Sequence, residues 1–245
     1  MIKLKNNMLK SKRSQMHVEM IISFIIFVGF IFTILYFINP VKEIKISTLK
    51  LNFVQEKVLN NVSLNYQTSS LILKDGLVIL GDCFWVNNKL ETSGNLITFD
   101  SSGVSRSSTS NLDKIYVDRV EGERIYHLYF SDNFDENIPS NLGSCVQVAD
   151  SNFSFGNLNN EKRVFYPFLE SLNTSFILNY VQLRDSLQIS DNFDFIVRDL
   201  NGVIIFDDST QLKTLTSNVL AREIPLNVLD SDASTRDFVL NLRVW

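Results

Sequence analysis

The sequence predicts an α+β protein in which a long N-terminal transmembrane and juxtamembrane helix is followed by a mainly antiparallel β domain with one packed helix. Three observations predict this class. Residues 20–38 carry no charge and are almost all apolar. Apolar residues continue at helical spacing to about residue 60, and their period then shifts toward two, which is typical of strands. Helical spacing returns once, at 175–188.

The apolar segment from Met20 to Ile38 has the length of a membrane-spanning helix. At about 1.5 Å per residue it covers roughly 28 Å, close to the hydrocarbon core of a bilayer. A cleaved secretory signal is the main alternative, but such a signal has an apolar core of about 7–15 residues and a small-x-small site after it. Residues 36–41 contain no such site, so we expect the helix to be retained.

The distribution of charge predicts how the chain is oriented and which partners it excludes. Five basic residues precede the apolar segment, which places the N-terminus in the cytoplasm: Lys3, Lys5, Lys10, Lys12 and Arg13. Residues 41–245 carry 18 basic and 26 acidic side chains, a net charge of −8. An acidic outer domain has no electrostatic attraction to nucleic acid, so nucleic acid is not expected as a partner.

These observations divide the chain into four expected parts. Residues 1–14 form a basic cytoplasmic leader, 15–40 a transmembrane helix, 41–60 a juxtamembrane helix, and 61–245 a β-rich extracellular domain, the ectodomain. Pro40 lacks an N–H donor and suits the first turn of a new helix, so we expect the second helix to continue from the first with a kink.

Within the ectodomain, alternating apolar residues and turn pairs predict two early hairpins. The first is centred on Asp75-Gly76 and joins strands at 70–74 and 77–80. The second is centred on Glu121-Gly122 and joins strands at 115–117 and 124–130. Between them we expect a short strand at 97–99 and a serine-rich, solvated loop at 100–111.

The C-terminal half predicts the packed helix and three more strands. Phe176, Tyr180, Leu183 and Leu187 share one face of the helix at 175–188. A hairpin turns at Asn201-Gly202 between strands at 193–197 and 203–206, and a last strand at 238–245 docks in a sheet. The pattern is compatible with one domain or with two closely packed halves divided near residue 160.

No arrangement of residues predicts catalysis, a metal or a cofactor, so we do not expect an enzyme. The two histidines, His17 and His127, have no Cys, His or carboxylate partner at ligand spacing. No nucleophile elbow or glycine-rich phosphate loop is found in the sequence. Asp230–Ser234 resembles the start of a calcium loop but lacks the glycine at its sixth position, so we interpret it as an acidic turn.

Two kinds of covalent modification are expected in the ectodomain. Cys83 and Cys145 are the only cysteines and lie outside the reducing cytoplasm, which favours a disulfide over two buried thiols. That bond would restrict the unfolded chain by about 4 kcal/mol. Three sequons make N-glycosylation plausible at Asn61, Asn152 and Asn173.

The residues just before the apolar helix resemble the processing site of type IV prepilins, and most closely the archaeal class III signal peptide. The residues that carry the resemblance are Lys12, Arg13, Ser14, Gln15 and Glu19. It implies that a prepilin-type peptidase cuts between Ser14 and Gln15. The new amine of Gln15 would then pair with the Glu19 carboxylate of its own or a neighbouring subunit and set the axial register of the packed helices.

The expected function follows from this resemblance and from the missing chemistry. We expect a membrane-anchored pilin-like or pseudopilin-like structural subunit, minor or adhesive, of a type IV-like cell-surface filament. Gly29 and Thr33, a small-xxx-small pair, would allow close helix approach. The partners would be membrane lipid, the peptidase, other pilin-like subunits and an extracellular ligand of unknown identity. The alternative is a single-pass anchored extracellular binding protein that does not assemble, with Lys12, Arg13 and Glu19 as the polar collar of an ordinary anchor.

Overall fold

The computed structural model describes residues 3–92, 94–140, 142–207 and 219–245. The chain divides into two compact units, Met1–Asn52 and Phe53–Trp245, and the second unit is called the head below. The fold class is α+β, with a mostly antiparallel sheet. The head forms one unit, so a division near residue 160 is not found.

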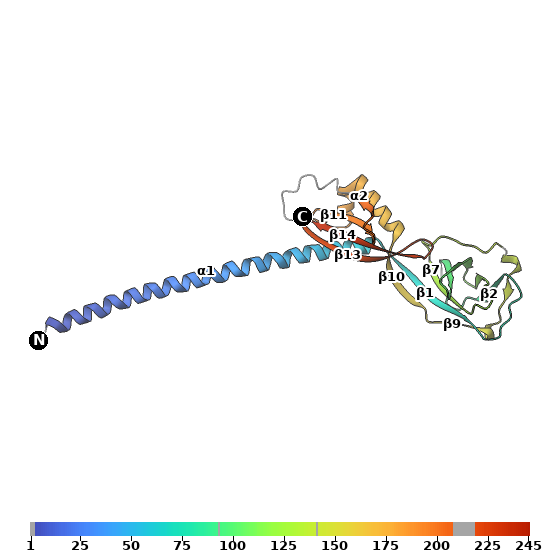
Figure 1. The fold of residues 1–245 in the computed structure, drawn as a ribbon, viewed down its shortest axis with the longest axis horizontal. Helices are drawn as coiled ribbons and strands as arrows, with labels where there is room; N and C mark the ends of the chain where they lie inside the picture. The colour runs from blue at the N-terminus through green and yellow to red at the C-terminus, as the bar shows by residue number, and fades with distance from the viewer. Residues whose placement is uncertain (1–2, 93, 141, 208–218) are drawn as a thin grey trace. The chain divides into compact units, whose positions relative to one another are not determined.

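The N-terminal helix, α1, extends from Lys3 to Asn61, so the expected transmembrane and juxtamembrane helices belong to one element (Figure 1). Its segment Glu19–Tyr36 is the one stretch in the described residues that is long and apolar enough to cross a membrane. The side chains of 19–36 are exposed, apart from a half-buried Val28. An apolar helix that exposes its whole circumference needs an apolar environment to cover it.

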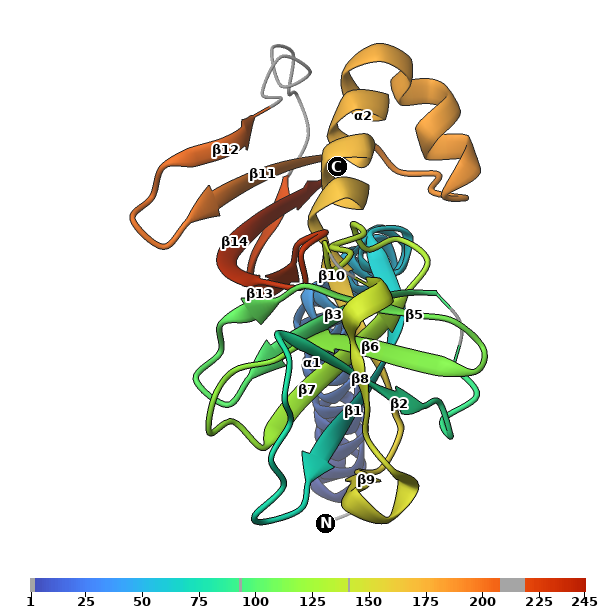
Figure 2. The ribbon, with the colours of Figure 1, turned by 90° about the vertical axis from the view of Figure 1, so that its right-hand side faces the viewer.

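The described strands of the head form two sheets. In the larger one the order is β12-β11-β14-β13-β10-β1-β7-β3-β4, and β9 also pairs with β1 (Figures 1 and 2). The smaller one has the order β5-β6-β2-β8. Pairing is antiparallel except at β10–β13 and β2–β8. The strands of the larger sheet are β1 (Ser63–Leu73), β3 (Asn95–Asp100), β4 (Ser105–Arg106), β7 (Ile125–Ser131), β9 (Phe153–Phe155), β10 (Asn159–Phe165), β11 (Phe193–Asp199), β12 (Ile204–Asp207), β13 (Leu220–Leu229) and β14 (Thr235–Val244). Those of the smaller sheet are β2 (Cys83–Asn87), β5 (Ser108–Ser110), β6 (Lys114–Asp118) and β8 (Val146–Gln147).

The hairpin expected at Asp75-Gly76 is wrong in its second strand. β1 ends at Leu73, and residues 77–80 form no strand. The end of β1 pairs instead with β9, from a distant part of the chain. Ile79 is buried while Val78 and Leu80 are exposed. The alternation of apolar residues at 77–80 therefore indicated correctly which side chains are buried. It did not indicate whether the segment pairs with another strand.

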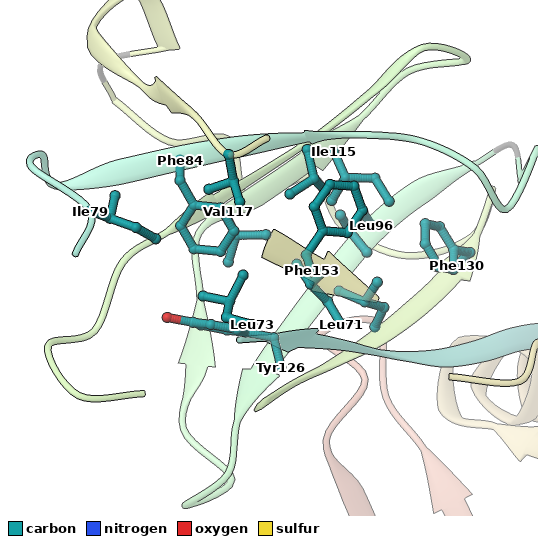
Figure 3. Packing of buried hydrophobic residues seen from close by; sticks show 13 residues of the cluster. Leu71, Leu73, Ile79, Phe84, Leu96, Ile115, Val117, Tyr126, Phe130 and Phe153 are labelled. Atoms are coloured by element: carbon teal, nitrogen blue, oxygen red, sulfur yellow. The ribbon is translucent and has the colours of Figure 1, made fainter. Parts of the chain in front are cut away.

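The second hairpin is also wrong, although both of its strands exist. β6 pairs with β2 and β5, whereas β7 pairs with β1 and β3 in the other sheet. The chain crosses from one sheet to the other at 119–124. Both strands turn apolar residues toward one core between the sheets (Figure 3), where Phe84 of β2 meets Tyr126 of β7 at a centroid distance of 5.5 Å. β6 and β7 are therefore connected by packing of their side chains in one core, and not by hydrogen bonds between their backbones.

The loop expected at 100–111 contains the short strands β4 and β5 and is only partly solvated. Ser108 is buried, and its hydroxyl donates to the Leu96 carbonyl at 3.2 Å. Asp100, 2% exposed, organises the turn into β4. Its Oδ1 accepts from the Ser102 hydroxyl at 2.6 Å and from the Val104 N–H at 3.0 Å, and its Oδ2 accepts from Arg106 Nε at 2.8 Å. The serine run is thus ordered by one buried carboxylate.

The second helix of the head, α2, covers Tyr166–Ser186 and begins nine residues before the expected 175–188. Pro167 suits its first turn, because the first N–H groups of a helix have no partner within it. Leu169, Leu172, Phe176 and Leu183 are buried, and the Phe176 ring lies 5.3 Å from that of Phe195 in β11. The helical period thus identified only the second half of the helix, where the apolar spacing is clearest.

The C-terminal strands confirm two expectations. β11 and β12 form the hairpin predicted at Asn201-Gly202, and Gly202 adopts a φ of 82°, which favours glycine. β14 is docked between β11 and β13. β13 was not expected, because its apolar residues are interrupted by Arg222, Glu223 and Pro225. The described residues of the head also contain two short 3-10 helices, η1 (Leu142–Ser144) and η2 (Asp150–Asn152).

Candidate functional site

The residues of the prepilin-like segment all lie in α1. Lys12, Arg13, Ser14 and Gln15 have helical backbone, and their side chains lie outside the described residues. Glu19 is exposed and opens the apolar segment. Because it follows Gln15 by four residues in a helix, the two positions lie one turn apart on the same face. A carboxylate at the edge of an apolar helix needs a polar or charged partner when lipid or another helix covers it.

The pair Gly29 and Thr33 lies in the middle of the apolar segment. The Thr33 hydroxyl donates to the Gly29 carbonyl at 2.8 Å, so it is satisfied by its own helix. A Cβ placed on Gly29 would have no atom within 4 Å. This face of α1 therefore offers a shallow surface without an unsatisfied hydroxyl, which suits close contact with another helix.

Cys83 and Cys145 form the predicted disulfide, with their Cα atoms 4.7 Å apart. Cys83 begins β2, and Cys145 directly precedes β8, the parallel neighbour of β2. β8 pairs with β2 through only two residues, Val146 and Gln147. The covalent bond therefore attaches a strand that backbone hydrogen bonds alone would hold weakly.

The structure distinguishes the three sequons. Asn61 is exposed at the last residue of α1. Asn152 is half-buried in η2 and accepts from the Ser151 hydroxyl at 3.3 Å. Asn173 is half-buried in α2, and its Oδ1 is buried without a hydrogen bond to another described residue. Asn61 is thus the most accessible of the three side chains for a glycan.

In the residues that the structure describes, no group of three or more His, Cys, Asp or Glu side chains is arranged to hold a metal ion. His127 is exposed on β7, and the side chain of His17 lies outside the described set. Asp230–Ser234 forms the tight turn between β13 and β14, closed by a bond from the Asp230 N–H to the Ser234 carbonyl at 2.9 Å. The segment is therefore a turn between two paired strands.

An aromatic pair lies on the outward face of the smaller sheet. Trp85 and Tyr116 face each other across β2 and β6, with ring centroids 6.4 Å apart. The Lys114 ammonium lies 4.1 Å from the centre of the Trp85 ring. Because this cation covers the indole face, the arrangement is best explained as a cation–π contact that stabilises the strand pair.

Sequence reasoning missed two polar cavities in the head. One, of about 310 Å³, lies beside Cys83 and is lined by Arg106 and Arg119 together with acidic and serine side chains. Both of its arginines are engaged within the protein, since Arg106 pairs with Asp100 and Arg119 contacts the Gly81 carbonyl at 3.5 Å. No sequence signal identifies such a site, because its residues come from four separate segments.

The other cavity, of about 320 Å³, lies where β1 and β7 separate, and we call it the fork cavity. It is lined by Asn65, Tyr66, Gln67, Phe130, Ser131, Asp132, Asn133 and Asn160.

A partly buried hydrogen bond anchors one wall of the fork cavity. The Tyr66 hydroxyl donates to Glu161 Oε2 at 2.6 Å. Burial and this bond raise the pKa of the Tyr66 phenol, and the bond from Tyr66, with others from Thr68 and Arg163, lowers the pKa of Glu161. The phenol therefore stays neutral and the carboxylate ionised at neutral pH.

Comparisons with protein-family models, with curated proteins and with solved structures found no match.

Proposed function

We propose that this chain is a membrane-anchored pilin-like or pseudopilin-like structural subunit, minor or adhesive, of a type IV-like cell-surface filament. The N-terminus lies in the cytoplasm, α1 crosses the membrane once, and the head lies outside the cell. A prepilin-type peptidase removes residues 1–14, and α1 then packs against the helices of other pilin-like subunits.

One observation carries this proposal: a single helix combines a prepilin-like segment, an exposed apolar stretch at Glu19–Tyr36 and direct entry into a folded head. An apolar helix whose side chains are exposed along that stretch is covered either by lipid or by neighbouring helices. When α1 moves from the membrane into a helix bundle, its apolar surface passes from lipid to other helices and is not exposed to water. This is the physical requirement of a subunit that is stored in a membrane and then assembled.

Removal of residues 1–14 would change the electrostatics of the helix end. It takes away all five early cations and leaves a free α-amine at Gln15, four residues before Glu19. An ionised carboxylate near hydrocarbon costs several kcal/mol unless it is paired. The new amine of the same or of a neighbouring subunit supplies that pair, and the position of the pair defines how far one helix is displaced along the next.

The start of the mature chain tests the processing step. We expect intact-mass measurement and N-terminal sequencing of the protein purified from its native membrane to give a chain that begins at Gln15. A Ser14→Asp variant serves as control, because a carboxylate at the cut position is expected to keep the leader attached. Native protein that still begins at Met1 would contradict processing.

Glu19→Ala tests the assembly step. We expect the variant to be inserted and its head to fold as in the wild type, while surface filaments that contain it are lost or strongly reduced, because the helices no longer have a charge pair that defines their register. Glu56→Ala, at an exposed position near the end of α1, is the matched control. Electron microscopy and quantification of sheared surface protein measure the effect, and unchanged filaments in Glu19→Ala would exclude the assembly role.

The alternative function is an anchored binding protein that remains a monomer in the bilayer. The fork cavity favours it, because a polar cavity in an outward-facing domain serves a binding protein whether or not the protein assembles. The same measurement separates the two functions: an anchored binding protein keeps residues 1–14, and its extracellular role does not depend on Glu19.

A further inference from the structure

The fork cavity is formed by the way the larger sheet divides. β1 pairs with β7 from Gln67↔Phe130 to Ile72↔Ile125, and with β10 from Ser63↔Val164 to Thr68↔Asn159 (Figure 1). Beyond Gln67↔Phe130 the chain of β7 turns away, while β1 continues beside β10 toward α1. The two strands therefore separate, and Asn65 and Asp132 line the space between them.

The side chains around this space have unused hydrogen-bonding capacity. Asn65, Asp132 and Asn133 make no side-chain hydrogen bond to another described residue. Gln67 Nε2 donates to Asn160 Oδ1 at 3.1 Å. This bond leaves the Gln67 carbonyl oxygen and the Asn160 amide nitrogen without a described partner. Each amide offers both a donor and an acceptor, so the cavity wall presents several of each close together.

The charge of the cavity restricts the class of ligand. No Lys or Arg is among its described lining residues, and Asp132 is its one ionisable carboxylate. Lys162, opposite Asn65 in the register, donates to Asn60 at 2.6 Å and is engaged there. An anionic ligand would find no compensating cation, and the head as a whole is acidic. Asp132 is exposed, so water screens its charge, and the amides around it match a neutral ligand that both donates and accepts hydrogen bonds.

The volume and the lining of the fork cavity also restrict the ligand. A cavity of about 320 Å³ lies at the lower end of the range for small-molecule sites, which is about 300–1,000 Å³, and suits about one or two sugar rings. The side chains of Tyr66 and Phe130 are almost fully buried, so the groups that a ligand meets in the cavity are mainly polar. A sugar ring, with hydroxyl groups around its edge, offers both donors and acceptors to such a wall.

We propose that the fork cavity binds a neutral saccharide, with Asn65, Asn133 and Asn160 as ligands for its hydroxyl groups and Asp132 as an acceptor. The site belongs entirely to the head, so this proposal goes beyond the filament function and does not depend on assembly. It assigns a chemical class to the extracellular ligand.

Saturation-transfer NMR on the full-length protein tests the proposal. The protein is held in micelles of a detergent without a sugar headgroup, so that the detergent does not compete. The probes are glucose, galactose, mannose, N-acetylglucosamine and N-acetylgalactosamine, with glucuronate and glucosamine as charged comparisons. We expect at least one neutral sugar to receive saturation, and to bind at least tenfold more tightly than its charged counterparts.

Paired variants locate the binding. We expect Asn133→Ala together with Asn160→Ala to weaken the affinity for that sugar at least tenfold, since each lost hydrogen bond accounts for a factor of roughly five. Asn159→Ala is the matched control. Asn159 directly precedes Asn160 in β10 and is also exposed, but it does not line the cavity. Unchanged thermal unfolding of each variant shows that the head is intact.

Three results would overturn the proposal: no neutral sugar binds, binding survives in the double variant, or glucosamine binds most tightly. None of these results concerns processing at Gln15 or filament formation, which are measured separately. Failure of the saccharide site and failure of the filament function are therefore distinguishable.

Discussion

We expect the double variant Cys83→Ala with Cys145→Ala, which lacks the disulfide, to have a free energy of unfolding about 4 kcal/mol lower than that of the wild type. The bond joins residues 62 apart, and cross-linking a loop of this length removes a corresponding amount of entropy from the unfolded chain. In the folded head, the bond attaches the two-residue strand β8 to β2. Its loss should loosen residues 142–148 before the rest of the head.

Denaturant unfolding followed by tryptophan fluorescence measures this effect, because both tryptophans, Trp85 and Trp245, lie in the head. Treating the wild type with a thiol reductant is the internal control: it should reproduce most of the loss and leave the double variant unchanged. A variant as stable as the wild type would show that pairing in the small sheet does not depend on the covalent bond.

Asp100→Asn is expected to destabilise the head by roughly 3 kcal/mol at neutral pH, since it breaks a charged pair in which the carboxylate is buried and leaves donors facing an amide. The donors are the hydroxyl and the N–H of Ser102, the N–H of Val104 and the guanidinium of Arg106. Asp113→Asn is the matched control, because Asp113 is exposed and its side chain makes no bond to another described residue. The measurement is again the free energy of unfolding.

The same carboxyl makes the stability depend on pH. Hydrogen bonds from Ser102, then from Val104 and Arg106, hold the pKa of Asp100 well below its usual value, although burial acts in the opposite direction. A carboxyl whose pKa is lower in the folded state stabilises the protein above its unfolded pKa of about 3.9 and loses that contribution as the pH falls below it.

The difference in stability between wild type and Asp100→Asn should therefore be constant above about pH 5 and shrink as the pH falls toward 2. Unfolding curves collected across this range measure it. A difference that stays constant down to pH 2 would show that the charge of Asp100 does not contribute.

Local patterns predicted elements better than pairings. The strands at 97–99, 115–117, 124–130, 193–197 and 238–245 all exist, because alternation records which side chains are buried. The partners of β6 and β7 were wrong, because a residue buried between two sheets has the same local pattern whichever sheet its strand joins. The hairpin at Asn201-Gly202 was right, because the two strands beside this turn also pair with each other. Turns form at Asp75-Gly76 and Glu121-Gly122 as well, but the segments beside them do not pair.

The fork cavity shows how little of a candidate site can be predicted from the sequence. Its walls come from residues near 65, near 131 and at 160, which have no common motif. They meet only because β1 exchanges one neighbour for another along its length, and that exchange depends on long-range contacts. In the sequence, Asn65 and Asn133 look like ordinary surface residues. Only the separation of β1 and β7 in the fold places them at a cavity.

The sequence by itself determined the apolar helix, the resemblance carried by the residues before it, the acidic charge of the head and the cysteine pair. These features depend on composition and on neighbours a few residues apart, which the order of amino acids states directly. Only the tertiary structure decided that the disulfide attaches β8, that Asp100 is buried and accepts hydrogen bonds from three residues, and that β1 and β7 separate around a polar cavity. Each of these requires segments distant in the chain to meet, and packing of the whole head determines which ones do.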